Sequence, residues 1–348
     1  MKKVLAPARR PAYYGLQEVT EMAKREPSAA DRARWDEERG AKIEAAKAAL
    51  RDGLRKLQTS EDWTTMLDGL ARDLRRKLSP GRYSFGNQML VAIHGHARAL
   101  DVSMVATFKT WERHGRRVTK GERAITILQP KLHKFSREVE GADGATETRE
   151  GARMYFRPLA VFALSQTDGE PIPEPPVTTA SVVDVTTPDG FALSLNCLGE
   201  VALAIEGSPV ASLTLRDRLP TDHSRASHGW YNQATRDIVV IRHESRAHEF
   251  HVAVHEVAHA LLHPLGDPHG APECEVEAES VSYVVCRALG LDASSFALPY
   301  VCTWASGDRA HEMVLRSGER ITKAARTILD ALLGEVTDDA PDSGAEEG

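Results

Sequence analysis

The chain has 348 residues, of which 42% are hydrophobic and 27% are charged, and its formal net charge is −6 at pH 7. These values are ordinary for a globular protein and exclude a mostly disordered chain. The length is sufficient for two domains with cores of their own, and no apolar run is long enough to predict a membrane span.

The end of the chain carries the negative charge. Residues 334–348 contain six acidic side chains and no basic one, so the rest of the chain is neutral. With almost nothing apolar to bury, this tail is predicted to be disordered. The four cysteines show no C-x-x-C spacing, which predicts reduced thiols in a cytoplasmic protein. The first residues lack the apolar stretch of a signal peptide.

The first half of the chain is predicted to be helical and then to form strands. Four helices are predicted, over residues 29–57 from a composition rich in Ala, Arg, Glu and Lys, over 63–78 from apolar residues at helical spacing, and over 87–100 and 105–114. Strands are predicted over residues 123–129 and 155–164, with the polar residues 136–153 between them as a long surface loop. This organisation gives an N-terminal helical extension, residues 1–58, and a small α+β domain, residues 59–167.

A basic stretch with interspersed aromatic residues lies in this domain. Residues 105–138 contain nine Lys and Arg against three Glu. Such a composition suits single-stranded DNA, because cations follow the phosphates and rings stack on unpaired bases. The candidate contacts are Tyr83, Phe85, Asn87, Lys109, Trp111, Arg113, Arg116, Arg117 and Lys120. The alternative is that the aromatic residues belong to the core and the basic turn is ordinary surface.

A proline-rich stretch separates the two halves of the chain. Residues 168–187 include four prolines between positions 171 and 176, which predicts an extended, stiff linker. The second domain is predicted over residues 188–333. Its expected elements are a helix, an antiparallel strand pair and a closing helix, at residues 191–205, 228–231 with 237–242, and 308–333.

The most informative motif follows the strand pair. His255, Glu256 and His259 form the pattern H-E-x-x-H in an apolar stretch without Gly or Pro before Pro264. Residues four apart share one helical face, so both imidazoles can bind one metal ion. The glutamate between them can reach a metal-bound water, as in a zinc peptidase. Histidines one turn away on either side are rival ligands, namely His251 and His263.

A second helix is predicted over residues 273–286, and it is rich in glutamate. A catalytic zinc needs a third protein ligand and an open position for water. A further carboxylate can hold the free N–H of a ligand histidine. The candidates for these two roles are Glu273, Glu275, Glu277 and Glu279. The alternative is an acidic, solvated helix without a metal.

Two segments, HEVAHALLH at 255–263 and EVEAESVSY at 275–283, resemble the zincin-type metallopeptidase domain of the ImmA/IrrE class. They resemble the corresponding domain of ArdC-type antirestriction proteins more closely. Residues 83–87 and 107–130 resemble the N-terminal single-stranded-DNA-binding domain of the same proteins. For the site, the resemblance implies Zn²⁺ on His255, His259 and Glu275, with Glu256 as general base and Glu279 supporting a ligand histidine.

The expected fold is therefore α+β, with a single-stranded-DNA-binding domain joined by a proline-rich linker to a zincin-like metallopeptidase domain. The expected function is DNA binding with zinc-dependent cleavage of a peptide or protein, in an antirestriction-like role that protects incoming or plasmid DNA. Two alternatives remain, a DNA-binding protein with a structural or idle metal site and a regulatory protease that cleaves a repressor. Candidates for the oxyanion donor are Tyr231, His228 and Tyr283.

Overall fold

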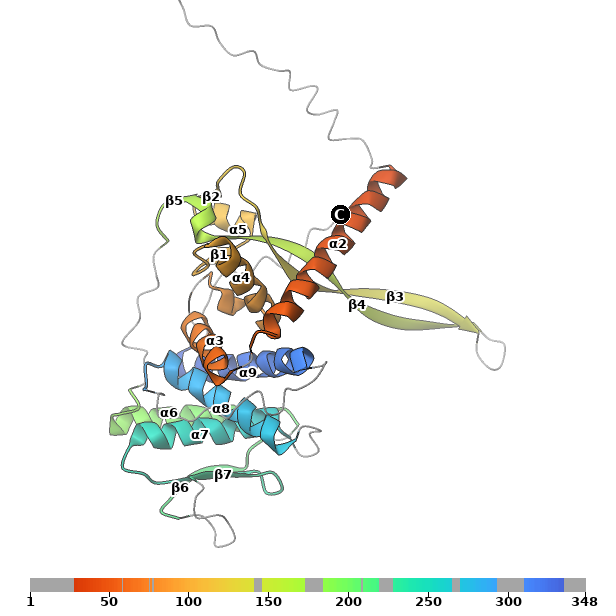
Figure 1. Cartoon of the computed structure of the whole chain (residues 1–348). Coiled ribbons are helices and arrows are strands. Elements are labelled where there is room, and N and C mark those ends of the chain that lie inside the picture. Colours follow the sequence, from red (N-terminus) through yellow and green to blue (C-terminus); the bar gives the residue numbers. More distant parts are fainter. Residues whose placement is uncertain are drawn as a thin grey trace, which may run out of the picture.

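The structure, a computed structural model, describes residues 28–57, 59–74, 76, 78–140, 146–172, 184–207, 209–218, 228–264, 270–292 and 310–334. Most of the predicted linker and nearly all of the predicted acidic tail lie outside these residues. The described part mixes helices with short sheets, so the predicted α+β class is confirmed (Figure 1).

The N-terminal helices begin where the sequence offers side-chain caps. Helix α2 (Ala29–Leu54) begins after Ser28, whose hydroxyl accepts from the backbone of Asp31 at 3.1 Å. Helix α3 (Ser60–Asp73) begins in the same way after Thr59. Such caps satisfy backbone N–H groups that have no partner within the helix. Helix α2 thus lies in the predicted N-terminal extension, and the helices of the predicted DNA-binding domain are α3, α4 (Phe85–Arg98) and α5 (Phe108–Arg113), which also begin after capping side chains.

The strands of this part form a small sheet with one long extension. Its order is β1 (Val105–Ala106), β4 (Thr146–Ala163) and β3 (Ile125–Glu140), and a separate pair joins β2 (Arg116–Val118) to β5 (Thr167–Gly169). Strands β3 and β4 pair without interruption from Ile125 opposite Val161 to Glu140 opposite Thr146. Residues 136–140 and 146–153, predicted as part of a long surface loop, are therefore strand, and residues 141–145 of that prediction lie outside the described residues. A ribbon that leaves the body buries neither face, so its sequence lacks the apolar alternation that marks a strand.

The C-terminal part places three helices and a sheet around the H-E-x-x-H motif. It consists of α6 (Pro188–Leu203), β6 (Ser212–Arg216), β7 (Gly229–Asn232), β8 (Asp237–Ile241), α7 (Arg246–Leu262), α8 (Ala271–Ala288) and α9 (Ala310–Leu333). The antiparallel pairing of β7 with β8 confirms the predicted strand pair, and β6, which was not predicted, lies parallel to β8. Helices α6 and α7 lie over this sheet (Figure 1).

The two predicted domains share one hydrophobic core. Trp63 of α3 is 1% exposed, and its indole N–H donates to the hydroxyl of Ser280 on α8 at 3.0 Å. The carboxylate of Glu319 on α9 accepts from the backbone N–H groups of Phe85 and Gly86 at 3.0 and 2.9 Å. Glu319 therefore satisfies the N-terminus of α4 from the other half of the chain, as an anion does at a helix start. These contacts hold α8 and α9 against the N-terminal helices.

Candidate metal centre

Helix α7 carries the H-E-x-x-H motif across the middle of the C-terminal part. Ser245 caps its start by accepting from the backbone N–H of His248 at 3.3 Å. Its apolar residues Phe250, Val254 and Val257 are fully buried, which fixes the rotation of the helix. His255 and His259 therefore point together toward α8, as their spacing predicts.

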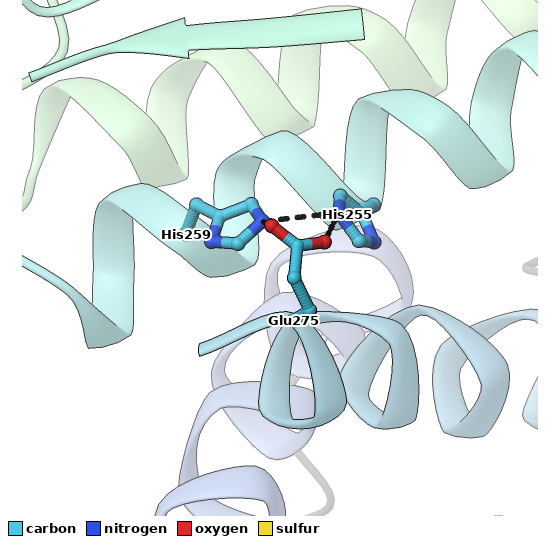
Figure 2. Close-up of side chains that lie close together, drawn as sticks. All are labelled: His255, His259 and Glu275. Atoms are coloured by element: carbon cyan, nitrogen blue, oxygen red, sulfur yellow. Dashed lines mark hydrogen bonds and ion pairs between the residues drawn. The ribbon is translucent and has the colours of Figure 1, made fainter. Parts of the chain in front are cut away.

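Three side chains from two helices meet at one point. The Nε2 atoms of His255 and His259 lie 3.0 Å apart, and each lies 3.5 Å from an oxygen of the Glu275 carboxylate. Figure 2 shows the carboxylate of Glu275 directed from α8 to the two rings on α7. One donor atom from each residue lies within 4.8 Å of the other two. The structure thus brings together the three residues that were predicted to be metal ligands.

These distances fit a tetrahedral divalent ion. Ligand bonds of about 2.0–2.2 Å at the tetrahedral angle place neighbouring donors about 3.3–3.5 Å apart. The two histidine nitrogens lie 3.0 Å apart and each lies 3.5 Å from a different oxygen of Glu275, so the donor groups are near that spacing. Two imidazole nitrogens and one carboxylate are also donors that such an ion accepts. The three side chains are therefore suited to hold a divalent metal.

Glu279 supports the centre from one turn further along α8. One of its oxygens lies 3.0 Å from Nδ1 of His255, and the other lies 3.3 Å from Nε2 of His251. The hydroxyl of Ser282 in turn lies 2.7 Å from Nδ1 of His251. A carboxylate at Nδ1 fixes the His255 tautomer with its proton on that nitrogen, which leaves Nε2 free to bind a metal.

The carboxylates control the ionisation of this cluster. Burial by itself lowers the pKa of His255, but Glu275 and Glu279 outweigh it and raise that pKa to about 10. Burial would raise the pKa of Glu279, whereas hydrogen bonds from His251 and His255 lower it to about 2. The carboxylates thus favour positive charge at His255, and a bound metal ion would supply that charge in place of a proton on Nε2.

The carboxylate of Glu256 lies against strand β7. Its side chain is 7% exposed, and burial raises the pKa of its carboxyl. The backbone N–H of Tyr231 donates to it. A Cβ atom at Gly229 would lie 2.7 Å from a carboxylate oxygen of Glu256 and 2.5 Å from Val252. Position 229 therefore has to lack a side chain.

Sequence reasoning missed two members of the centre, Gly229 and Ser282. A glycine at the start of a strand is the one available signal for Gly229, because such glycines often mark a close approach. Nothing in the sequence distinguishes Ser282 from the other small residues on α8.

The two histidines considered as rival ligands, His251 and His263, do not point to the place where His255, His259 and Glu275 meet. His251 faces Glu279 rather than the point where the three donors meet. His263 is 2% exposed and lies 3.7 Å from Glu277, which also accepts from Arg320 of α9 at 2.9 Å. The hydroxyl of Tyr283, a candidate oxyanion donor, donates instead to Asp68 of α3 at 2.9 Å. Tyr283 is therefore excluded from that role in this conformation.

Five of the predicted DNA contacts are corrected by the structure, because they are buried. Tyr83, Phe85, Asn87, Trp111 and Arg116 are between 0% and 9% exposed. The amide group of Asn87 exchanges hydrogen bonds with the backbone of Leu128, and Trp111 donates to the carbonyl of Phe162 at 2.9 Å. Arg116 donates to the carbonyls of residues 167, 169 and 170. These side chains build the domain, and the alternative of core aromatics holds for Trp111.

The other four predicted contacts lie at the surface. Lys109, Arg113, Arg117 and Lys120 are all exposed on or beside α5 and β2. Phe108, in the same helix as Trp111, is 47% exposed. A basic surface with an accessible ring therefore remains next to the buried Trp111. DNA binding at these four residues stays a prediction.

The fold and the site define an α+β protein with a candidate metal centre of two histidines and one glutamate. Residues 46–162 match the family model of the N-terminal domain of anti-restriction factor ArdC. This part of the chain is therefore similar to the ArdC N-terminal domain, and the predicted resemblance to ArdC-type antirestriction proteins is confirmed. The match ends before α6, so the ImmA/IrrE-like class of the second domain stays a prediction.

The individual proteins that match this chain have low sequence identity to it, 25% or less. A Bacillus anthracis protein described as uncharacterized is 25% identical over 251 residues, which are 65% of this chain and 42% of that protein. Thus the aligned region spans less than half of that relative. Two crystal structures of the antirestriction protein ArdC from plasmid R388 also match, one metal-free and one Mn(II)-bound. They are 18% and 16% identical, cover 73% and 72% of this chain and 87% and 89% of their own, and each has a TM-score of 0.41.

Among the described residues, no helix is both long and apolar enough to cross a membrane.

Proposed function

We propose that this chain is an antirestriction-type protein that binds single-stranded DNA and carries a zinc-dependent peptidase centre. The observation that carries the peptidase proposal is the convergence of His255, His259 and Glu275 within 4.8 Å. A structural zinc site is closed by four protein ligands, whereas a catalytic site has three and leaves one position open. Three converging donors beside a buried glutamate favour the catalytic type.

The chain's own residues would divide the work as follows. His255, His259 and Glu275 would hold the ion, and Glu279 would keep His255 in the required tautomer. When bound, zinc lowers the pKa of its water to about 7 and polarises a carbonyl. Glu256 would accept the proton of that water and pass it to the leaving amine. Its raised pKa suits such a base, because transfer in both directions is efficient only when the pKa lies near the working pH.

A peptide substrate has a suitable neighbour in strand β7. This strand lies at the edge of its sheet, with β8 as its partner among the described strands. Tyr231 of β7 donates its N–H to Glu256, so the strand runs beside the proposed base. An exposed strand edge can pair with an extended peptide through backbone hydrogen bonds. A peptide held there would place a carbonyl close to the metal and to Glu256.

The decisive variant is Glu256→Gln, which removes the base without removing a metal ligand. We expect zinc content to stay at the wild-type level and protection of an unmodified plasmid in a restricting host to be lost. General base removal typically costs 10²–10⁴-fold in rate. Glu244→Gln, at an exposed position just before α7, is the matched control. Full protection by Glu256→Gln with zinc bound would contradict the peptidase proposal and favour an idle metal site.

DNA binding by the first part of the chain is supported by its family and by the exposed basic residues around α5 and β2. Binding that depends on phosphate contacts weakens as salt rises, with a slope of about −0.7 per contact for single strands. We expect a labelled single-stranded oligonucleotide to bind the full chain with such a slope, and the Lys109→Ala/Lys120→Ala protein to bind with a shallower one. A salt-independent affinity would contradict the proposal.

A further inference from the structure

The β3–β4 ribbon projects from the body as an arm (Figure 1). Pairing begins at the buried residues Ile125 and Val161 and continues through Gln129 opposite Arg157 to Glu140 opposite Thr146. From Leu132 outward, the described side chains of the arm are exposed, apart from the half-buried Gly151. A two-stranded ribbon that buries neither face contributes little to a core. Its side chains are therefore available for contacts outside the molecule.

The register gives the arm two chemically different faces. The pairing contains no bulge, so residues directly opposite each other share a face and successive residues alternate between faces. One face, called here the cationic–aromatic face, carries His133, Phe135, Arg153, Tyr155 and Arg157. The opposite face carries Pro130, Leu132, Lys134, Met154 and Phe156, and is mostly apolar.

The rings of the cationic–aromatic face are accessible and ordered by their neighbours. Phe135 is 44% exposed and Tyr155 is 43% exposed. The rings of His133 and Phe135 are stacked, with centroids 6.3 Å apart and planes at 24°. Phe135 also lies over Gly151 on the other strand, where an added Cβ would come within 2.7 Å of the ring. The missing side chain at Gly151 lets this ring lie across the ribbon.

The base of the arm is also positively charged. Residues 131–136 and 150–157 contain Lys131, Lys134, Arg153 and Arg157 against one acidic residue, Glu150. Guanidinium groups and exposed rings on one face match the two parts of a nucleic-acid strand, the phosphates and the bases. Rings can stack on bases only when the bases are unpaired, so a single strand is favoured over a duplex.

We propose that single-stranded DNA lies along the cationic–aromatic face of the arm, with bases stacked on Phe135 and Tyr155 and phosphates contacted by Arg153 and Arg157. This inference rests on the strand binding proposed above and assigns a surface to it. Tyr155 pairs with Lys131, four positions from Phe135, which is about 14 Å along the ribbon. That is about four times the base spacing along one strand of a DNA helix, so each ring takes a separate base.

The test compares the two faces of the same arm in the full chain. The variants are Phe135→Ala/Tyr155→Ala and Arg153→Ala/Arg157→Ala, and the matched control is Leu132→Ala/Met154→Ala on the opposite face. Fluorescence anisotropy with a labelled oligo-dT would be measured over a salt series. We expect the aromatic pair to weaken binding at least tenfold. We expect the arginine pair to reduce the salt slope by about 1.4, and the control to stay within twofold of wild type.

Several outcomes would overturn the assignment. If the wild type binds oligo-dT and both arm variants bind equally well, the strand lies elsewhere and only this inference fails. If the wild type binds no strand at all, the proposed DNA-binding function fails as well. Equal loss in the Leu132→Ala/Met154→Ala control would show that the arm acts without a specific face. A dimer without DNA that the aromatic variant dissociates would assign the face to a second copy of the chain.

Discussion

Charged side chains are paired in a partly buried cluster at the metal centre, whereas they are exposed on the arm. At the centre, His255, Glu275 and Glu279 are drawn into one cluster, and each charge has an opposite charge within 3.5 Å. On the arm, Arg153 and Arg157 are exposed on a ribbon without a core. Charges in a partly buried cluster depend strongly on one another, whereas exposed charges act nearly independently. Substitutions should therefore be coupled at the centre and local on the arm.

The largest effect is expected from removing a ligand at the centre. His255→Ala deletes one of the three donors and leaves Glu275 and Glu279 facing each other without the cation between them. We expect metal content, measured by mass spectrometry of the purified protein, to fall to background. His96→Ala, at an exposed histidine of α4 far along the chain from the motif, is the control. Retention of stoichiometric metal by His255→Ala would show that the ion, if any, binds elsewhere.

The next largest effect is the difference in unfolding free energy between replacing a buried aromatic residue of the body and replacing an exposed one of the arm. Trp111 is fully buried, and Trp111→Ala should cost about 3–5 kcal/mol in the free energy of unfolding. Tyr155→Ala removes a ring that is 43% exposed, so it should change stability by less than about 0.5 kcal/mol. Chemical denaturation followed by circular dichroism measures both. Similar losses for the two variants would mean that the arm packs against the body more than its exposure indicates.

This contrast explains why the metal centre could be predicted from sequence and the DNA contacts only in part. The spacing of His255 and His259 is local, and a helix converts it directly into geometry. Choosing Glu275 over Glu277 was not local, because the difference is made by Arg320 on α9, which binds Glu277. The resemblance to a family supplied that choice, and the structure places Glu275 at the histidines.

A sequence in which aromatic residues lie near basic ones does not predict whether the aromatic side chains are exposed or buried. Tyr83, Phe85 and Trp111 look like stacking platforms in the sequence, but they are buried by contacts with segments far along the chain, such as the Trp111 bond to Phe162. The outer part of the arm was not predicted as strand because its sequence carries no apolar pattern. The sequence of residues 136–140 and 146–153 is mostly polar, and local composition alone cannot distinguish such a ribbon from a loop.

A smaller effect tests how strongly the centre is coupled. Glu279→Gln keeps the size of the side chain but removes the charge that fixes the His255 tautomer. Loss of such an outer partner typically weakens metal affinity about 10–100-fold. Competition with a coloured chelator measures the affinity, and Glu273→Gln in the first turn of α8 is the control. An affinity equal to wild type would mean that the carboxylate does not orient His255.

The last comparison concerns glycines, whose surroundings differ between the two regions. At Gly229 an added methyl would meet Val252 and Glu256, both part of a packed site. Gly229→Ala should therefore cost about 1–3 kcal/mol of stability and displace the proposed base. At Gly151 the methyl would meet only the outer end of the Phe135 ring, which can turn aside on the exposed arm.

Gly151→Ala should thus leave the unfolding temperature nearly unchanged and weaken DNA binding if Phe135 contacts the strand. Gly199 in α6 has nothing within 4 Å of an added methyl. Gly199→Ala should stabilise the protein by about 0.5–1 kcal/mol, because alanine is the better helix former. Thermal unfolding of the three variants gives the order Gly199→Ala, Gly151→Ala, Gly229→Ala, from most to least stable. If Gly151→Ala is instead as damaging as Gly229→Ala, the arm is held as rigidly as the metal centre and the contrast between the two regions fails.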